Sequence, residues 1–367
     1  QALVIAHACY GHNSFFKGNY LFRTWTSADA IIDYLVFARK YIAECEERYG
    51  YEEVELLLDS CHALMNYGVD RYKRPSPLSM AEEKKRQRER EAYLQSQVND
   101  LWRTLPVDRD QAEDGRAERH FPEEPQENLL YFIEKNAPLL EPWQREIVRI
   151  VRKVGQYFYP QRQTQVMNEG WATFWHYTLL NRLYDEGLVT DGFMMEFLAS
   201  HTSVLFQPGF DHPGYSGINP YALGFAIYSD LRRMCESPTD EDREWFPDIA
   251  GGNWLEVLPA AMRDFKDESF IQQFMSPRVM REFRLFGILD DDADSEIEVR
   301  AIHDHGGYRR VRELLASQYN LGDQTPNIQV IKVDVRGDRS LTLRHTQHQR
   351  RPLGASTGDV LKHLHRL

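Results

Sequence analysis

Hydrophobic side chains recur every three or four residues along most of the chain, which is the spacing of an amphipathic α-helix. The pattern is clearest between Ser27, the expected N-cap, and Gly50, where it ends. Further helices are predicted at about 2–16, 51–67, 127–136, 141–159, 163–186, 191–204 and 219–235. Asp191 or Thr190 is expected to cap the helix at 191–204, and the last helix begins at Asn219-Pro220, because proline is favoured in the first helical turn. The sequence therefore predicts a mainly α-helical protein.

The pattern changes after the acidic run at 290–294. The elements predicted beyond it are a strand at 297–301, a helix at 308–319, strands at 328–335 and 340–345, and a helix at 360–365. The order β-α-β-β-α describes a small α+β module. We therefore predict a helical domain over 1–290 and a small α+β C-terminal domain over 296–367.

Residues 80–127 differ in composition from both regions. The stretch 82–91 is almost wholly charged, with opposite charges four residues apart, and 105–127 is rich in proline, acidic residues and arginine without periodicity. Charge runs of this kind are typical of a solvated helix face. We predict that 80–127 is an exposed charged insertion, with docking of a protein partner as the alternative role.

Composition and charge exclude several classes of protein. The 367 residues are 42% hydrophobic and 12% aromatic, as in a globular protein. A net charge of -12 disfavours nucleic-acid binding, and no apolar run approaches the roughly 20 residues of a membrane helix. The four cysteines lack metal-type or disulfide-type spacing, which indicates a cytoplasmic protein. Because the chain opens on Gln1 without a methionine, we expect a fragment that lacks an N-terminal segment.

His7 and His12 are the first candidates for chemistry. Metal-binding histidines on a helix normally lie four residues apart, whereas these lie five apart and would point roughly 140° from one another on a regular α-helix. A π-bulge, a feature that concentrates at functional sites, would align them. Ala8 stands where a zinc peptidase of the HExxH type carries its general base. A metal site, another functional pairing and a pair of buried structural histidines remain alternatives.

The segment 168–176 places Glu169, Thr173 and His176 among bulky aromatic residues. Glu169 and His176 face one way on a helix but lie about 10.5 Å apart along its axis, too far for both to ligate one ion. We predict Glu169 as a ligand or base, Thr173 one turn away, and His176 lining the cleft as a substrate or supporting group. The alternative is a buried Glu169 neutralised by an arginine of the Arg232-Arg233 pair.

Weaker candidates surround the glycine- and proline-rich loop at 207–220, which could close over a cleft. They are His201, Asp211, His212, Tyr215 and Asn219, each of which is singly more typical of a structural role. Glu196 is the acid that would complete a hydrolytic site if it converged on the histidines. The sequence contains no phosphate-binding loop, serine nucleophile motif or dinucleotide fingerprint.

Several long motifs resemble the SpoVR family, the stage V sporulation protein R-like proteins, including its YcgB-type members. They are AHACYGHNSFFKGN at 6–19, MNEGWATFWHY at 167–177, SGINPYALGFAIYSDLRR at 216–233, DESFIQQFMSP at 267–277 and the 302–347 tail. The resemblance implies a link to the spore cortex, a peptidoglycan layer, or to stress response. It also implies a PrkA-type serine kinase and a YeaH-type protein as partners.

The Asn168-Glu169-Gly170-Trp171-Ala172 segment is also similar to the NExxA helix of gluzincin metallopeptidases. This likeness implies zincin-like features, with Glu169 as the third zinc ligand beside His7 and His12. The five-residue spacing and the missing base bear on peptidase activity more than on metal binding. Our leading hypothesis is a metal-dependent, gluzincin-like hydrolase that uses zinc, with Glu169, Thr173 and His176 in the catalytic site and a peptide or peptidoglycan-related substrate. The alternative is a non-catalytic regulatory partner of the kinase system.

Overall fold

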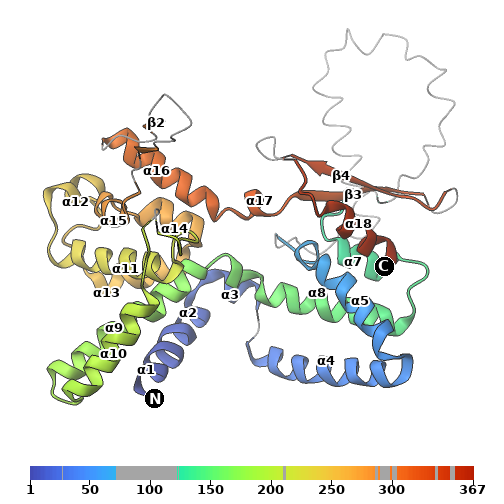
Figure 1. Cartoon of the computed structure of the whole chain (residues 1–367), viewed down its shortest axis with the longest axis horizontal. Coiled ribbons are helices and arrows are strands. Elements are labelled where there is room, and N and C mark those ends of the chain that lie inside the picture. The colour runs from blue at the N-terminus through green and yellow to red at the C-terminus, as the bar shows by residue number, and fades with distance from the viewer. Residues whose placement is uncertain are drawn as a thin grey trace, which may run out of the picture. The chain divides into compact units, whose positions relative to one another are not determined.

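The computed structural model describes residues 1–26, 28–71, 122, 124–209, 212–285, 288–289, 298–299, 304–334, 338–347 and 352–367. Within these ranges the chain is mainly helical, as predicted, and its strands form two short antiparallel pairs (Figure 1). The Ser27 cap, the acidic run at 290–294, Asp211 and almost all of the 80–127 insertion lie outside the described residues.

The chain divides into two compact units. Unit 1 comprises Gln1–Leu56, Lys153–Pro326 and His348–Leu353. Unit 2 comprises Leu57–Arg152, Asn327–Gln347 and Gly354–Leu367. Two helices pass from one unit into the other along the chain, α5 (Tyr51–Ala63) and α8 (Pro142–Arg162).

Unit 1 holds most of the helices. Those of its N-terminal part are α1 (Ala2–Val4), the π-helix η1 (Ile5–His12), α2 (Asn13–Gly18), α3 (Tyr20–Trp25) and α4 (Ala28–Tyr49). Those that follow α8 are α9 (Gln165–Asp185), α10 (Asp191–Val204), α11 (Pro220–Glu236), α12 (Asp240–Trp245), α13 (Trp254–Asp264), α14 (Asp267–Phe274), α15 (Pro277–Glu282), α16 (His305–Gln318) and α17 (Leu321–Gln324). The predicted caps Thr190 and Asn219 are confirmed, since each side chain accepts a backbone N–H of the helix that it precedes.

The core of unit 1 forms where α9 packs against α11. A Cβ on Gly170 would lie 2.4 Å from Gly224 Cα, and one on Gly224 would lie 2.1 Å from the Val166 carbonyl oxygen, so only glycines allow the two helices to approach this closely. Leu223, Ile227 and other fully buried apolar residues fill the interface around them. This contact fixes the position of α9, the helix that carries Glu169.

Asp267 holds the N-terminal end of α9 from a distance of about one hundred residues in sequence. Its carboxylate oxygens accept the backbone N–H groups of Val166 and Met167, each at 2.9 Å, and so satisfy donors that have no partner within the helix. Burial raises the pKa of Asp267 to about 7, although these N–H groups act in the opposite direction. A buried carboxylate therefore anchors the turn immediately before Glu169.

Unit 2 is built around a hairpin and a buried carboxylate. Its elements are the short helix η2 (Met65–Tyr67), α7 (Leu129–Asn136), β3 (Asn327–Val333), β4 (Leu341–Thr346) and α18 (Thr357–Arg366). The strands pair antiparallel, Asn327 opposite Thr346, with an irregularity between Val330 and Lys332, and Leu129 and Phe132 of α7 pack on Val330. The carboxylate of Glu134 is only 1% exposed and pairs with Lys135, Arg149 and Arg152 at 2.8–3.0 Å.

The C-terminal elements occur in the predicted order β-α-β-β-α. Strand β2 (Glu298–Val299), however, pairs with β1 (Ile288–Leu289) and not with the β3–β4 hairpin. Helix α16 packs against α14 in unit 1, whereas β3, β4 and α18 belong to unit 2. The elements expected to form one module at 296–367 are thus divided between two units, since α16 places Tyr308, Val311 and Leu315 in the core of unit 1.

Candidate metal centre

The π-helix η1 resolves the unusual spacing of His7 and His12. The π-type turn that would align them is present, because Ile5–His12 forms an eight-residue π-helix between α1 and α2. Five residues then separate side chains on one side of the helix, as four would in an α-helix. The ring atoms His7 Nε2 and His12 Nε2 lie 3.0 Å apart.

Helix η1 lies directly against α9, and Gly11 makes this contact possible. A Cβ at Gly11 would lie 2.5 Å from Ala172 Cα, which is closer than real Cβ contacts allow. Near the same contact, the Trp171 indole N–H donates to the Ser14 hydroxyl at 2.9 Å. The two segments singled out in the sequence, 6–13 and 168–176, therefore meet in space.

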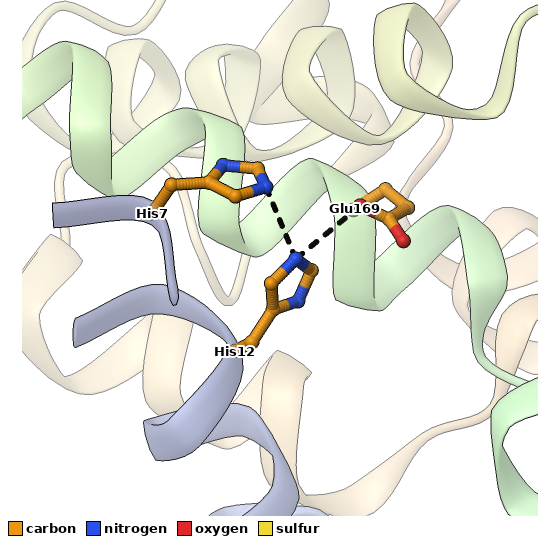
Figure 2. Close-up of side chains that lie close together, drawn as sticks. All are labelled: His7, His12 and Glu169. Carbon is orange, nitrogen blue, oxygen red and sulfur yellow. Dashed lines mark hydrogen bonds and ion pairs between the residues drawn. The ribbon is translucent and has the colours of Figure 1, made fainter. Parts of the chain in front are cut away.

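The meeting point brings together two imidazoles and one carboxylate. His12 Nε2 lies 3.5 Å from Glu169 Oε2 and 3.0 Å from His7 Nε2, as the dashed lines in Figure 2 show. One ligand atom from each of the three residues lies within 4.8 Å of the others. His7 and His12 come from η1 and Glu169 from α9, so the three predicted metal ligands converge from two elements.

A second layer of hydrogen bonds fixes the histidine rings. His12 Nδ1 lies 2.9 Å from Asn168 Oδ1, and His7 Nδ1 lies 3.0 Å from His176 Nδ1. His176 Nε2 in turn lies 2.9 Å from His201 Nδ1 on α10. Metal-binding histidines typically use one ring nitrogen for the ion and the other for such a partner. Here both Nδ1 atoms are engaged, which leaves the two Nε2 atoms, 3.0 Å apart, as the candidate metal-binding atoms.

Burial keeps most of these rings uncharged. Burial, and then the charge of His12, lowers the pKa of His7 to about 4. Burial, followed by His201 and His7, lowers the pKa of His176 to about 3, and burial lowers that of His201 to about 4. Neutral imidazole is the form that binds a metal ion, so these three rings need lose no charge before an ion binds.

Among the described residues no arginine pairs with Glu169, so Arg232 and Arg233 do not neutralise it as the alternative required. Arg232 pairs with Glu236, and Arg233 pairs with Asp230 and Asp242. Glu169 Oε2 is buried and has no hydrogen-bond partner among the described residues. Its carboxylate lies close enough to Tyr221 to add to the effect of burial, which raises the pKa of that phenol.

Thr173 and His176 occupy different surroundings on α9. Thr173 Oγ1, one turn from Glu169, is buried and has no hydrogen-bond partner among the described residues. His176 is 5% exposed and lies behind His7, with both ring nitrogens engaged by histidines. Of the two roles expected for His176, this position favours the supporting one.

Four of the remaining candidates do not converge on the histidines: His212, Tyr215, Asn219 and Glu196. His212 and Tyr215 are exposed, and His212 Nδ1 accepts the N–H of Gly214 within its own loop. Asn219 caps α11, and Glu196 is exposed on α10. Of the described residues, His7, His12 and Glu169 form the one group that could hold a metal ion. The structure thus supplies a ligand set without a second carboxylate beside it.

Some groups around the site carried little signal in the sequence. Asn168 was visible only as the residue before Glu169, and its contact with His12 depends on the packing of η1 on α9. Tyr221 follows the cap of α11, and only the α9–α11 contact brings it to Glu169. His201 was named for its nearness to the 207–220 loop, whereas its contact is with His176.

Comparison with known proteins identifies the family. The SpoVR-like protein family matches residues 1–324, and the SpoVR-like C-terminal domain matches 326–367. The chain is 70% identical over 367 residues to the uncharacterized protein YcgB of Escherichia coli (strain K12), covering 100% of this chain and 72% of that protein.

No solved structure matches the chain, so the zincin-like character implied by the 168–172 motif stays a prediction. Among the helices that the structure describes, none is long and apolar enough to cross a membrane. The motifs, the two family matches and the 70% identical relative agree, and the chain belongs to the SpoVR family.

Proposed function

We propose that the chain binds a divalent metal ion, zinc in the first instance, through His7, His12 and Glu169, and that it is a metal-dependent hydrolase. The observation that carries this proposal is the convergence of two imidazole Nε2 atoms and one carboxylate oxygen at 3.0 and 3.5 Å. Two donor atoms bound to one zinc ion with tetrahedral geometry lie about 3.3–3.6 Å apart. The His12–Glu169 separation falls in this range, and the His7–His12 separation is just below it.

The partly buried carboxylate of Glu169 is better suited to binding a cation than to a structural role in the core. An unpaired buried carboxylate oxygen is costly, and Glu169 Oε2 has no hydrogen-bond partner among the described residues. The Nδ1 atoms of both histidines are occupied by Asn168 and His176. Their Nε2 lone pairs would face each other at 3.0 Å unless a proton or a metal ion lay between them. A metal ion satisfies all three groups at once.

The surrounding residues suggest how such a site would work. A divalent ion would supply Lewis acidity and ionise a bound water near neutral pH. Asn168 and His176 would hold His12 and His7 in the orientation that ligation needs. The Thr173 hydroxyl, one turn from Glu169, has no partner among the described residues and would hydrogen-bond a reacting group there. Peptide or peptidoglycan-related bonds are the substrate class that the family's link to the spore cortex implies.

Metal analysis of the purified chain tests the proposal. We expect about one equivalent of zinc or another divalent metal after mild purification, and a loss of at least tenfold in His12→Ala. His62→Ala is the matched control, since His62 is exposed on α5 and outside the ligand group. Less than a tenth of an equivalent in the parent chain, unchanged in His12→Ala, would falsify the metal site.

A second function is favoured by what the site lacks. Ala8 stands where a zinc peptidase has its base, and no second carboxylate joins the ligand group in the part of the chain that the structure describes. A regulatory partner of a PrkA-type kinase and a YeaH-type protein would need no base. Binding to those proteins that survives both His12→Ala and Glu169→Ala would support this role, and turnover of a peptide or muropeptide that both variants abolish would support the hydrolase.

A further inference from the structure

Four imidazole rings and one amide form an unbroken series through the site. The order is Asn168, His12, His7, His176, His201, and each neighbouring pair of polar atoms lies 2.9–3.0 Å apart. Each contact can hold only one proton. The position of the proton in one contact therefore determines its position in the next.

In the metal-free chain with neutral rings, the amide sets the direction of the series. Asn168 Oδ1 accepts a proton from His12 Nδ1, so His12 Nε2 is an acceptor. His7 must then donate through Nε2, and its Nδ1 becomes an acceptor for His176 Nδ1–H. By the same logic, His176 Nε2 accepts from His201 Nδ1–H. A neutral imidazole carries one proton, so each contact of the series then has one donor and one acceptor.

Metal ligation changes the tautomer of three of the rings. An ion at His7 Nε2 displaces the proton from that atom, and a neutral His7 must then carry its proton on Nδ1. His176 Nδ1 becomes the acceptor, so His176 carries its proton on Nε2 and donates to His201 Nδ1. His201 must carry its own proton on Nε2. The change cannot end at His176, because that ring has a histidine on both sides.

We propose that His7, His176 and His201 form a tautomeric relay that couples metal binding at His7 to the protonation site of His201 on α10. The relay rests on the metal site proposed above. One proton leaves His7 Nε2 for solvent, the His176 Nδ1 proton moves to His7 Nδ1, the His201 Nδ1 proton moves to His176 Nε2, and one proton from water enters at His201 Nε2. The protein thus gains and loses one proton, and its charge is unchanged apart from the ion.

The surroundings of His201 suit the end of such a relay. Its ring is 6% exposed and is held by apolar and aromatic contacts with Tyr177, Phe197 and Phe225. Nδ1 is directed at His176, and among the described residues Nε2 has no hydrogen-bond partner that would fix its proton. The stacking on Tyr177, with ring centroids 4.8 Å apart, restrains the ring from rotating. The proton, and not the ring, is the part that can change position.

Histidine-selective ¹⁵N NMR of the full chain at pH 8 tests the relay during a zinc titration. The ring nitrogens report which atom carries the proton, and single His→Gln variants assign the signals. We expect zinc to bind His7 and His12 through Nε2 and to convert His201 from the Nδ1–H to the Nε2–H tautomer. His62, exposed on α5, is the internal control and should not change.

The outcomes separate the relay from the metal site. Zinc ligation at His7 and His12 with the His201 tautomer unchanged would overturn the relay and leave the metal site intact. No zinc-dependent change at His7 or His12 would overturn both.

Two substitutions at His201 provide a second test. An amide can both donate to and accept from His176, so His201→Asn should keep zinc affinity within about threefold of the parent chain. His201→Leu can do neither and should weaken zinc binding by about tenfold, the lower end of the range for partners of metal ligands. Equal zinc affinity in the parent chain and in His201→Leu would contradict the relay.

Discussion

Two glutamates, one in each unit, show how a structural carboxylate differs from a candidate ligand. Glu134 of unit 2 is surrounded by Lys135, Arg149 and Arg152, and every cation lies within 3.0 Å of its carboxylate. Among the described residues, Glu169 of unit 1 pairs with no arginine or lysine, and the basic side chain beside it is that of His12, at 3.5 Å. Both carboxylates are largely withdrawn from water, but only Glu134 has its charge balanced by the protein.

The difference between the two glutamates indicates which carboxylate is available to bind a cation. Burial raises the pKa of Glu134, but hydrogen bonds from Lys135, Arg149 and Arg152 outweigh it and lower the pKa overall. That carboxylate is committed to holding α7 and α8 together. The Glu169 carboxylate and the paired Nε2 atoms are held in place by surrounding groups yet lack a counter-charge, which is the condition of a site prepared for a cation.

Removing the charge at each glutamate should affect stability very differently. Glu134→Gln removes the anion shared by three cations and should lower the free energy of unfolding by about 3 kcal/mol, since breaking a buried pair is strongly destabilising. Glu169→Gln in the metal-free chain should lower it by less than about 1 kcal/mol, because no cation loses a hydrogen-bonded partner. Urea unfolding measures both values. Similar losses would mean that Glu169 is also a structural carboxylate.

The order of the two variants should reverse for metal affinity. Glu169→Gln removes a ligand and should weaken zinc binding by about 100-fold, the upper end of the effect seen when only a partner of a ligand is lost. Glu134→Gln should leave the affinity within about threefold, measured at a temperature where both variants are folded. Calorimetry or competition with a chelating dye gives the constants. Unchanged affinity in Glu169→Gln would remove this residue from the ligand set.

An alanine at Gly11, where η1 approaches α9, should reduce stability and zinc affinity more than an alanine at another helix glycine. Gly11→Ala puts a methyl group 2.5 Å from Ala172 Cα, so η1 must move, and we expect a loss of about 1–3 kcal/mol in stability and of at least tenfold in zinc affinity. Gly192→Ala in α10 is the matched control, because nothing lies within 4 Å of its added Cβ. Equal behaviour of the two variants would show that this contact does not position the histidines.

The buried histidines of unit 1 and Glu134 of unit 2 should lose their contributions to stability in different pH ranges. In the metal-free chain, His7, His176 and His201 have pKa values of about 4, 3 and 4, against 6.5 for free histidine, so the unfolded chain binds their protons more readily. Their contribution to stability is therefore complete above about pH 6.5 and is lost as the pH falls towards 4. The pKa of Glu134 lies below its usual 4.5, so its contribution is lost only below that pH.

Urea unfolding between pH 4 and pH 8 separates these windows. His176→Gln should flatten the fall in stability between about pH 6.5 and 4.5, whereas Glu134→Gln should leave that slope unchanged. The expected change is small, at most one proton's worth of slope, or about 1.4 kcal/mol per pH unit. If stability changes with pH equally in His176→Gln and in the parent chain, the His176 ring does not cause the fall in stability.

The sequence determined the local structure well. Helical spacing located α4, α9, α10 and α11 to within a few residues, and the caps Thr190 and Asn219 stand where the pattern placed them. The five-residue spacing of His7 and His12 indicated a π-bulge, and the arithmetic on Glu169 and His176 separated a residue near the ligands from one behind them. Each of these features depends on periods of a few residues, which the sequence contains directly.

The tertiary structure decided which of those local features meet. Packing at Gly11 and Ala172 brings η1 to α9, and only then do Asn168, His176 and His201 become partners of the histidines. Tertiary packing also divided the predicted C-terminal module, because α16 buries Tyr308, Val311 and Leu315 in the core of unit 1, a contact that the local order of elements does not indicate. The reason is physical: spacing along a helix sets the direction of a side chain, whereas its partner depends on which distant segments exclude water together.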